Sequence, residues 1–249
     1  MIPIRSSIAL AALAAGSLVP AATPGASAQA TPPTRSWQLA LWTQAGYQHS
    51  MGRFATNSPY DVPELGLLDA FAEFSGARKL GGGVELALPA SDFSFRLGLE
   101  TTSGGEAMGH IGICDIVDAN VCREEVAPTR MRSVTFDARS SRAGPQRRIA
   151  PVLALGLGLR WYEFSVPDCN GLSQLDKLVC EAITDIYRDA KPNVILRMGG
   201  GFRAHLGRRL LAELAAGAST GRYTGGAGNS EGQWYHEVHA NLSVGVVVF

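Results

Sequence analysis

The stretch FSFRLGLE, residues 93–100, alternates between apolar and polar side chains without a break. One side of an extended chain is apolar, with Phe93, Phe95, Leu97 and Leu99. The other side is small or charged, with Ser94, Arg96, Gly98 and Glu100. Successive side chains of a β-strand point to opposite faces, so this period of two predicts a strand with two unlike faces.

The same alternation recurs along the chain and predicts eight strands. They cover residues 37–47, 79–88, 93–102, 131–140, 153–161, 193–206, 210–219 and 234–248. The connections alternate in length: long or medium ones lie at 49–77, 104–130, 167–190 and 223–232, and short ones at 89–92, 141–148 and 207–208. Long loops at one end and short turns at the other are typical of an antiparallel up-and-down transmembrane barrel. We therefore expect an all-β fold of eight strands with long extracellular loops.

The polar face of these strands is expected to point into the barrel. It is rich in glycine, which suits the narrow interior of eight strands. It also carries both charge signs, which can pair across facing strands. The expected interior charge network consists of Lys79, Glu85, Arg96, Glu100, Asp137, Arg139, Arg160, Arg197, Arg203, Glu213 and Glu237. The aromatic residues Trp37, Tyr47, Trp161 and Trp234 fall near strand ends, where membrane barrels carry aromatic girdles. A soluble periplasmic ligand-binding barrel with the apolar face inward is the alternative.

The first thirty residues have the features of a secretory signal peptide. Arg5 precedes an apolar run over residues 8–19, and small residues follow at Ala28 and Ala30. The run is too short for a spanning helix, which needs about 20 apolar residues. We expect a signal peptide over residues 1–30, a linker over 31–35 and a barrel domain over 36–249, exported to the outer membrane.

The four cysteines are Cys114, Cys122, Cys169 and Cys180. An even number in an exported protein favours disulfides. Three pairings are possible, and proximity favours Cys114–Cys122 and Cys169–Cys180. A metal site that adds His110 is the alternative, but the paired spacing of a structural zinc site is missing. We expect no metal and no other cofactor.

Two of the long connections carry helical patterns. One covers residues 63–75, with Leu67, Leu68, Phe71 and Phe74 at helical spacing. The other begins at a plausible N-cap, Ser173, and its apolar residues continue to Ile186. Short helices are possible in both segments, packed over the barrel rim. A lid, a partner-binding helix or a lipid-surface helix is the alternative.

The chain ends in VVVF, residues 246–249, which resembles the C-terminal strand of bacterial outer-membrane barrels. Such a strand commonly ends in Phe and is read by the barrel-assembly machinery, so the resemblance implies that Phe249 is an assembly signal. Phe249 shares the parity of Glu237 and Ser243, and a bulge near Gly245 would be needed to turn it toward lipid. Residues 36–249 as a whole resemble the small eight-stranded outer-membrane proteins of the OmpA/OmpX-like type. The resemblance implies outer-membrane lipid and the assembly machinery as partners.

The chain contains 22 basic and 22 acidic residues, so charge gives no case for nucleic-acid binding. It contains no P-loop, GxSxG, HExxH or dinucleotide-binding fingerprint. The leading hypothesis is a non-enzymatic barrel with a structural or surface-interaction role, carried by disulfide-stapled loops that contact a surface partner. A narrow pore or carrier for small hydrophobic molecules is the second hypothesis. The third is a lipid-modifying enzyme, with His236, His239, Ser243 and Glu237 as candidates.

Overall fold

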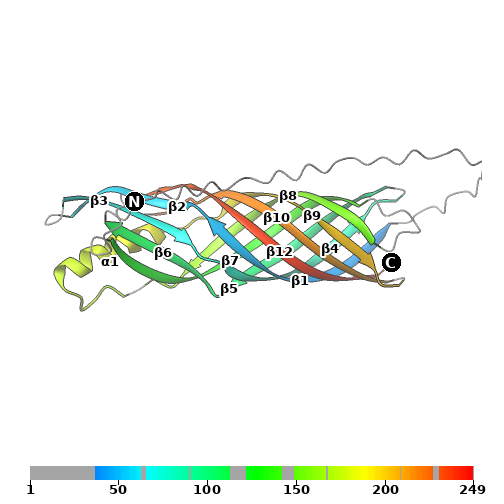
Figure 1. Ribbon diagram of the computed structural model, residues 1–249, viewed down its shortest axis with the longest axis horizontal. Coiled ribbons are helices and arrows are strands. Elements are labelled where there is room, and N and C mark those ends of the chain that lie inside the picture. Colours follow the sequence, from blue (N-terminus) through cyan, green and yellow to red (C-terminus); the bar gives the residue numbers. More distant parts are fainter. Residues whose placement is uncertain are drawn as a thin grey trace, which may run out of the picture. The chain divides into compact units, whose positions relative to one another are not determined.

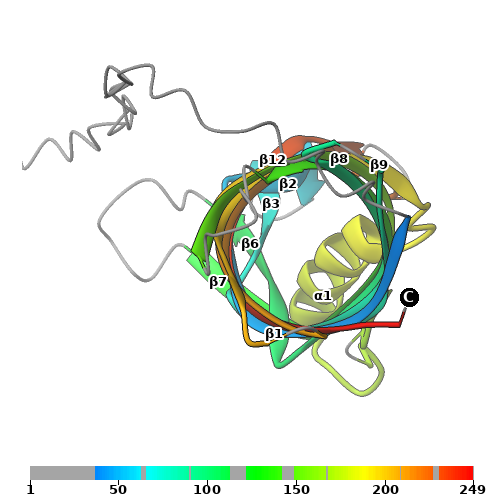
Figure 2. The ribbon, with the colours of Figure 1, turned by 90° about the vertical axis from the view of Figure 1, so that its right-hand side faces the viewer.

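The computed structural model describes residues 37–62, 66–89, 91–112, 122–141, 149–166, 168–207, 209–226 and 230–248. Within these residues, eight strands close into a ring in which every neighbour is antiparallel and the last strand pairs with the first (Figures 1 and 2). They are β1 (Gln38–Met51), β4 (Ala77–Ala87), β5 (Phe93–Ser103), β7 (Cys122–Ser141), β8 (Ile149–Phe164), β9 (Asn193–His205), β10 (Leu210–Arg222) and β12 (Trp234–Val247). The eight-stranded antiparallel barrel expected from the sequence is confirmed.

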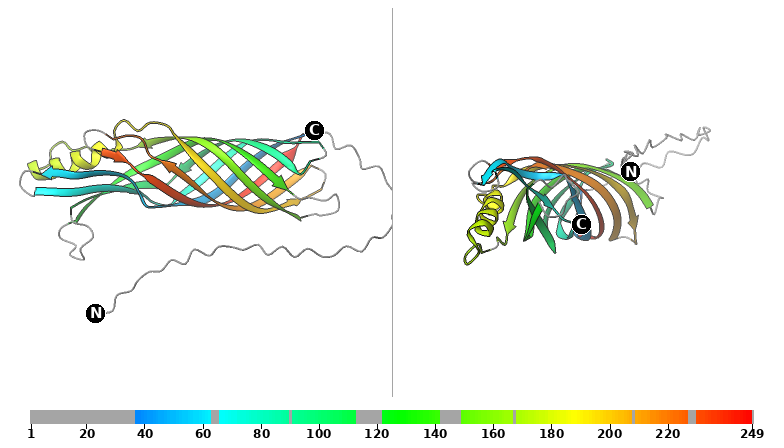
Figure 3. Two further views of the ribbon diagram at one scale, coloured as in Figure 1. Left: turned by 90° about the horizontal axis from the view of Figure 1, so that it is seen from above. Right: turned by 60° about the vertical axis from the view of Figure 1, so that its left-hand side comes forward.

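A second structure, which we call the extension, continues from one end of this ring. It comprises β2 (Arg53–Val62), β3 (Gly66–Phe74), β6 (Gly105–Gly112), β11 (Ser230–Gly232), the helix α1 (Gln174–Tyr187) and the first half of β7. The 20-residue strand β7 joins the two parts, because its first half pairs with β6 and its second half with β5. Figure 3 shows the extension at the end of the tube away from the C-terminus. The long connections are therefore largely regular structure.

The helix expected over residues 63–75 is wrong, because this segment forms strand β3. β3 is hydrogen-bonded on both edges, to β2 and to β6. Its inward side chains alternate with period two, and Ala70, Ala72 and Phe74 are buried. The hydrogen bonds on both edges and the buried inward face outweigh the local helical spacing of Phe71 and Phe74.

The second expected helix is confirmed as α1. The backbone N–H of Asp176 donates to the hydroxyl of the N-cap Ser173 at 3.2 Å, as capping requires. The helix lies across the end of the ring when the tube is viewed along its axis (Figure 2). A disulfide joins Cys169, which precedes α1, to Cys180 within it.

The interior of the extension is apolar and aromatic. Phe54 stacks on Phe74 with 3.8 Å between the ring centroids, and Ile183 of α1 is fully buried beside them. A Cβ atom added at Gly109 of β6 would collide with the Ile183 side chain, so a glycine lets the helix approach this strand. We call this region the aromatic core, and its buried members are Phe54, Ala55, Ala70, Ala72, Phe74, Ala107, Ile111, Ala127, Met131, Tyr162, Ala182, Ile183, Ile186, Tyr187, Tyr223 and Tyr235.

Strand β12 keeps one register past Gly245. Gly245 pairs with Trp42, and Val246 with Leu41, so no bulge at Gly245 shifts the register toward Phe249. Phe249, Cys114 and residues 1–36, which include the expected signal peptide and linker, lie outside the described residues. Among the described helical residues, none belong to a helix long and apolar enough to cross a membrane.

Candidate functional site

A broad apolar belt covers the outside of the ring. On β8 it runs from Ile149, 60% exposed, through Leu155, 67% exposed, to Trp161. The twelve steps from residue 149 to residue 161, at about 3.3 Å each, span about 40 Å, and a strand tilt near 40° reduces this to roughly 30 Å along the barrel axis. The other strands continue the belt with Leu41, Leu80, Leu97, Leu99, Phe136, Val194, Leu196, Met198, Phe202, Leu214, Leu242 and Val244. The height of the belt along the barrel axis is therefore that of a bilayer's hydrocarbon layer.

The inside of the ring holds the charged side chains that the alternation assigns to it. The structure places all eleven expected network residues on the interior side, ten of them buried and Asp137 slightly less so. They come from different strands: Glu85 and Lys79 from β4, Arg96 and Glu100 from β5, and the remainder from β7 to β12. They divide into three groups along the barrel axis.

The group nearest the short turns joins three arginines to two glutamates, and we call it the three-arginine cluster. Glu85 accepts from Arg96 at 2.7 Å and from Arg203 at 2.8 Å. Glu213 accepts from Arg203 at 2.8 Å and also binds Arg139. The Arg96 guanidinium lies over the Trp42 ring, 4.3 Å from its centroid.

The other two groups are smaller. In the central group, Glu100 accepts from Lys79 at 2.9 Å and from Arg197 at 3.0 Å, and Arg197 also lies 3.7 Å from Asp137. The third group, next to the extension, is the pair between Arg160 and Glu237 at 2.6 Å. Buried charges need this density of partners, because removing them from water is costly.

The inner face and the outer face of β8 both change polarity at the same level of the barrel. Inside β8, Arg160 is followed by Tyr162 and Phe164, so the lining becomes aromatic. Outside β8, Trp161 is followed by the exposed Glu163.

Strand β7 changes over in register with β8. Inside, Ser133 gives way to Met131, which pairs with Tyr162 of β8. Outside, Val134 gives way to Arg132, which pairs with Trp161. Arg132 binds Glu163 across the outer face at 3.1 Å. The change of polarity therefore occurs in register on two neighbouring strands, β7 and β8.

The aromatic core closes the barrel above the third charge group. Tyr162 donates to the side-chain oxygen of Asn193 at 2.8 Å and also bonds the hydroxyl of Tyr235. Tyr223 donates to the backbone carbonyl of Ile186 in α1 at 3.0 Å, and its burial raises the pKa of this phenol. Charged pairs and packed rings thus fill the passage from the short turns to the helix.

Sequence reasoning missed these tyrosines as part of the interior. The signal was their parity: Tyr162 shares an inward face with Arg160, and Tyr235 shares one with Glu237. The strand expected at 153–161 stopped one residue before Tyr162.

The residues considered for lipid chemistry do not form a catalytic group. His236 points outward, whereas Ser243 is buried inside the barrel. His239 and Ser243 pair with Gln48 and Gln44 of β1, four residues apart in register. Glu237 is engaged by Arg160. The described residues contain no group of three His, Cys, Asp or Glu side chains placed to hold a metal ion.

Comparison with known proteins supports the fold. No family model matches the chain, and no curated protein matches it. Among solved structures, the outer membrane protein OprG from Pseudomonas aeruginosa aligns with a TM-score of 0.50 at 10% identity, over 86% of this chain and 96% of its own. Neisserial surface protein A (NspA) aligns with a TM-score of 0.41 at 13% identity, over 83% of this chain and 97% of its own. Ail from Yersinia pestis aligns with a TM-score of 0.37 at 12% identity, over 84% of this chain and 99% of its own. The chain therefore has the fold of a small eight-stranded outer-membrane β-barrel.

Proposed function

We propose that this protein spans the outer membrane as a non-enzymatic barrel and presents the extension at the cell surface for interaction with a partner. Export through a signal peptide over residues 1–30 and assembly through the C-terminal strand, with Phe249 as its signal, belong to this proposal. We assign a structural role to the eleven interior charges, because they fill the barrel and pair its strands across the interior.

The observation that carries the proposal is the matched change of polarity on the two faces. A barrel in water would need a polar outside along its whole length, yet the belt exposes Leu153 and Leu155 at 68% and 67%. Above Trp161 the outside becomes polar and the inside becomes apolar, as in a soluble domain. A bilayer that ends at this level accounts for both changes.

The filled interior supports a surface role over a pore. An eight-stranded barrel leaves little lumen even before side chains are placed. Here the lumen holds charge groups along the barrel axis, and the aromatic core and α1 lie over them. Planar-bilayer recordings are expected to show no steady conductance, and a stable open channel would favour the pore hypothesis.

The topology is tested by labelling single added cysteines on intact cells. Lys177→Cys places a thiol on the exposed side of α1, and Arg209→Cys places one beside the short turn between β9 and β10. A membrane-impermeant maleimide should label the first variant in intact cells and the second only after the outer membrane is opened. Equal labelling of both variants, or recovery of the protein in the soluble fraction, would overturn the proposal.

The enzyme hypothesis has its own measurement. Mass spectrometry of lipid A from cells with and without the protein is expected to give the same acyl and phosphate pattern. A change that depends on Ser243 or His239 would move the protein into the lipid-modifying class.

A further inference from the structure

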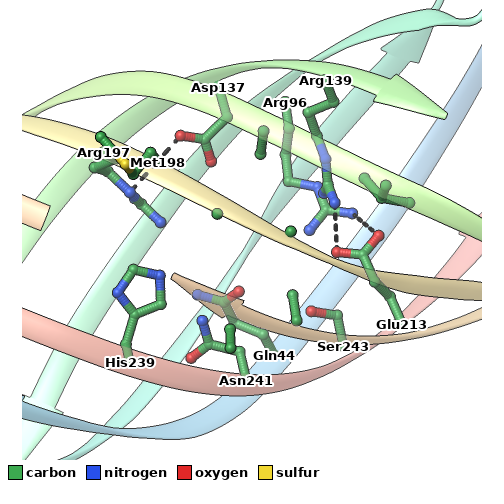
Figure 4. Close-up of a pocket in the computed structure, with 16 residues that line it drawn as sticks. Gln44, Arg96, Asp137, Arg139, Arg197, Met198, Glu213, His239, Asn241 and Ser243 are labelled. Carbon is green, nitrogen blue, oxygen red and sulfur yellow. Dashed lines mark hydrogen bonds and ion pairs between the residues drawn. The ribbon is translucent and has the colours of Figure 1, made fainter. Parts of the chain in front are cut away.

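The barrel interior contains a cavity of about 50 Å³ between the three-arginine cluster and the central charge group. Arg139 and Arg197 border it from its two ends, and Gln44, His239 and Asn241 lie along one side (Figure 4). These residues come from β7, β9, β1 and β12, so the cavity is a product of the closed ring.

Two of the arginines that line this cavity each have a guanidinium nitrogen that lacks an acceptor. Nε of Arg139 and Nη1 of Arg197 are buried and have no hydrogen-bond partner among the residues that the structure describes. The two arginines are 5% and 9% exposed. A guanidinium stays protonated, so these N–H groups must find an acceptor or lose the free energy of hydration.

The charge count identifies what the acceptor should be. In the described interior, three arginines of the three-arginine cluster face two glutamates, which leaves one positive charge. The central group balances, with Lys79 and Arg197 against Glu100 and Asp137, and Arg160 balances Glu237. A water molecule would satisfy the N–H groups, but it would leave this charge uncompensated in a region of low dielectric.

We propose that the barrel binds one small inorganic anion of halide size between Arg139 and Arg197. A water site needs on the order of 10–15 Å³, so the cavity has room for a halide and a few waters but not for an organic or phosphorylated ligand. The anion neutralises the excess charge and offers an acceptor in a cavity that both arginines line. It is thereby part of the folded barrel's interior.

The replacement Asn241→Asp tests the site without removing either arginine. Asn241 lines the cavity, is 6% exposed, and its Oδ1 has no hydrogen-bond partner among the described residues. Aspartate has nearly the same size and supplies a fixed negative charge in place of the anion. The matched control is Asn170→Asp, the same change at an exposed position before α1, outside the ring.

Urea unfolding of the refolded protein in detergent should be compared in sodium bromide and in sodium gluconate at equal ionic strength, since gluconate is too large for the cavity. Bromide at a hundred times its Kd should lower the unfolding equilibrium constant of the wild type and of N170D about a hundredfold. N241D should unfold at the same midpoint in both salts. Crystals soaked in bromide should give an anomalous-scattering peak in the cavity of the wild type and none in N241D.

Two results would overturn the proposal. One is a bromide response that N241D retains in full, because it would arise elsewhere on the protein. The other is a cavity in bromide-soaked wild-type crystals that contains water and no bromine signal.

Discussion

The same β-strands enclose two interiors of opposite character. Along the apolar belt the inside is charged, with Glu100 and Arg197 paired at 3.0 Å. In the extension the inside is aromatic, with Phe54 and Phe74 stacked at 3.8 Å. The outside changes in the opposite sense, from exposed leucines to an exposed Arg132–Glu163 pair.

If hydrocarbon surrounds the belt and water surrounds the extension, the medium outside the barrel accounts for the character of each interior. Where hydrocarbon covers the outside, as we propose for the belt, the apolar face contacts lipid. The polar side chains inside must then pair with one another. Where water covers the outside, burial of apolar rings drives the packing. A substitution should therefore have different consequences in the two regions, and the following predictions test that contrast.

The largest effect is expected for Glu100→Leu. It removes the carboxylate that binds Lys79 and Arg197, and an uncompensated buried charge costs about 3–5 kcal/mol. The free energy of unfolding is measured by urea titration in lipid vesicles. Glu106→Leu, at an exposed position of β6, is the control and should change stability by less than about 0.5 kcal/mol. Equal losses from the two variants would erase the distinction between the interiors.

Leu97→Arg should destabilise the barrel by about 2–4 kcal/mol, because it places a charge in the belt near the bilayer centre. Val126→Arg is its counterpart in the extension, where the side chain is similarly exposed, 46% against 50%. If water surrounds the extension, this control should shift stability by about 0.5 kcal/mol or less. Folding yield in vesicles and the heat-dependent shift on gels report both variants. A tolerated Leu97→Arg would contradict the membrane position of the belt.

Gly109→Val should loosen the extension and leave the ring folded. The added side chain collides with Ile183, and overpacking of this kind costs about 1–3 kcal/mol. Hydrogen exchange should accelerate in α1 and stay unchanged in β9 and β10. Met108→Val changes the neighbouring residue of β6 and should leave exchange in α1 as it is. Acceleration throughout the ring would show that the two regions fold as one unit.

Ser173→Ala should have the smallest effect. It removes the hydroxyl that accepts from the Asp176 N–H, a loss of about 1 kcal/mol confined to the first turn of α1. Amide exchange in residues 174–177 measures it, with Ser165→Ala at an exposed position as the reference. Identical exchange in the two variants would mean that the disulfide to Cys180 holds the helix start without the cap.

The barrel could be predicted from the sequence because period-two alternation is a local property. Each strand of the ring shows it, and the side that carries glycine and both charge signs could be assigned inward on grounds of space and pairing. The partners of each charge could not be assigned, since they depend on register across strands such as β5 and β9, which are 97 residues apart at the Glu100–Arg197 pair.

The extension was harder to predict for a different reason. Strand β3 pairs on one edge with β2 and on the other with β6, which is distant in sequence. Its sequence shows helical spacing at Phe71 and Phe74, which does not indicate these partners. The free N–H groups of Arg139 and Arg197 were likewise invisible in the sequence. They depend on how each guanidinium group fits against its carboxylate partners in three dimensions.

The three-residue strand β11 has a consequence for proteins crowded on one surface. An edge strand with many unpaired backbone amides can pair with the edge strand of a second molecule, and this pairing can begin fibre growth. The ring has no edge strand, because β12 pairs with β1 and closes it. On one side the sheet of the extension ends at β11, which covers only Ala55–Asn57 of β2 and leads directly into β12. On the other side it ends at β7, whose pairing with β8 begins only at Thr129. Edge-to-edge contact between neighbouring copies would therefore have to begin at the start of β7 or at the part of β2 beyond β11.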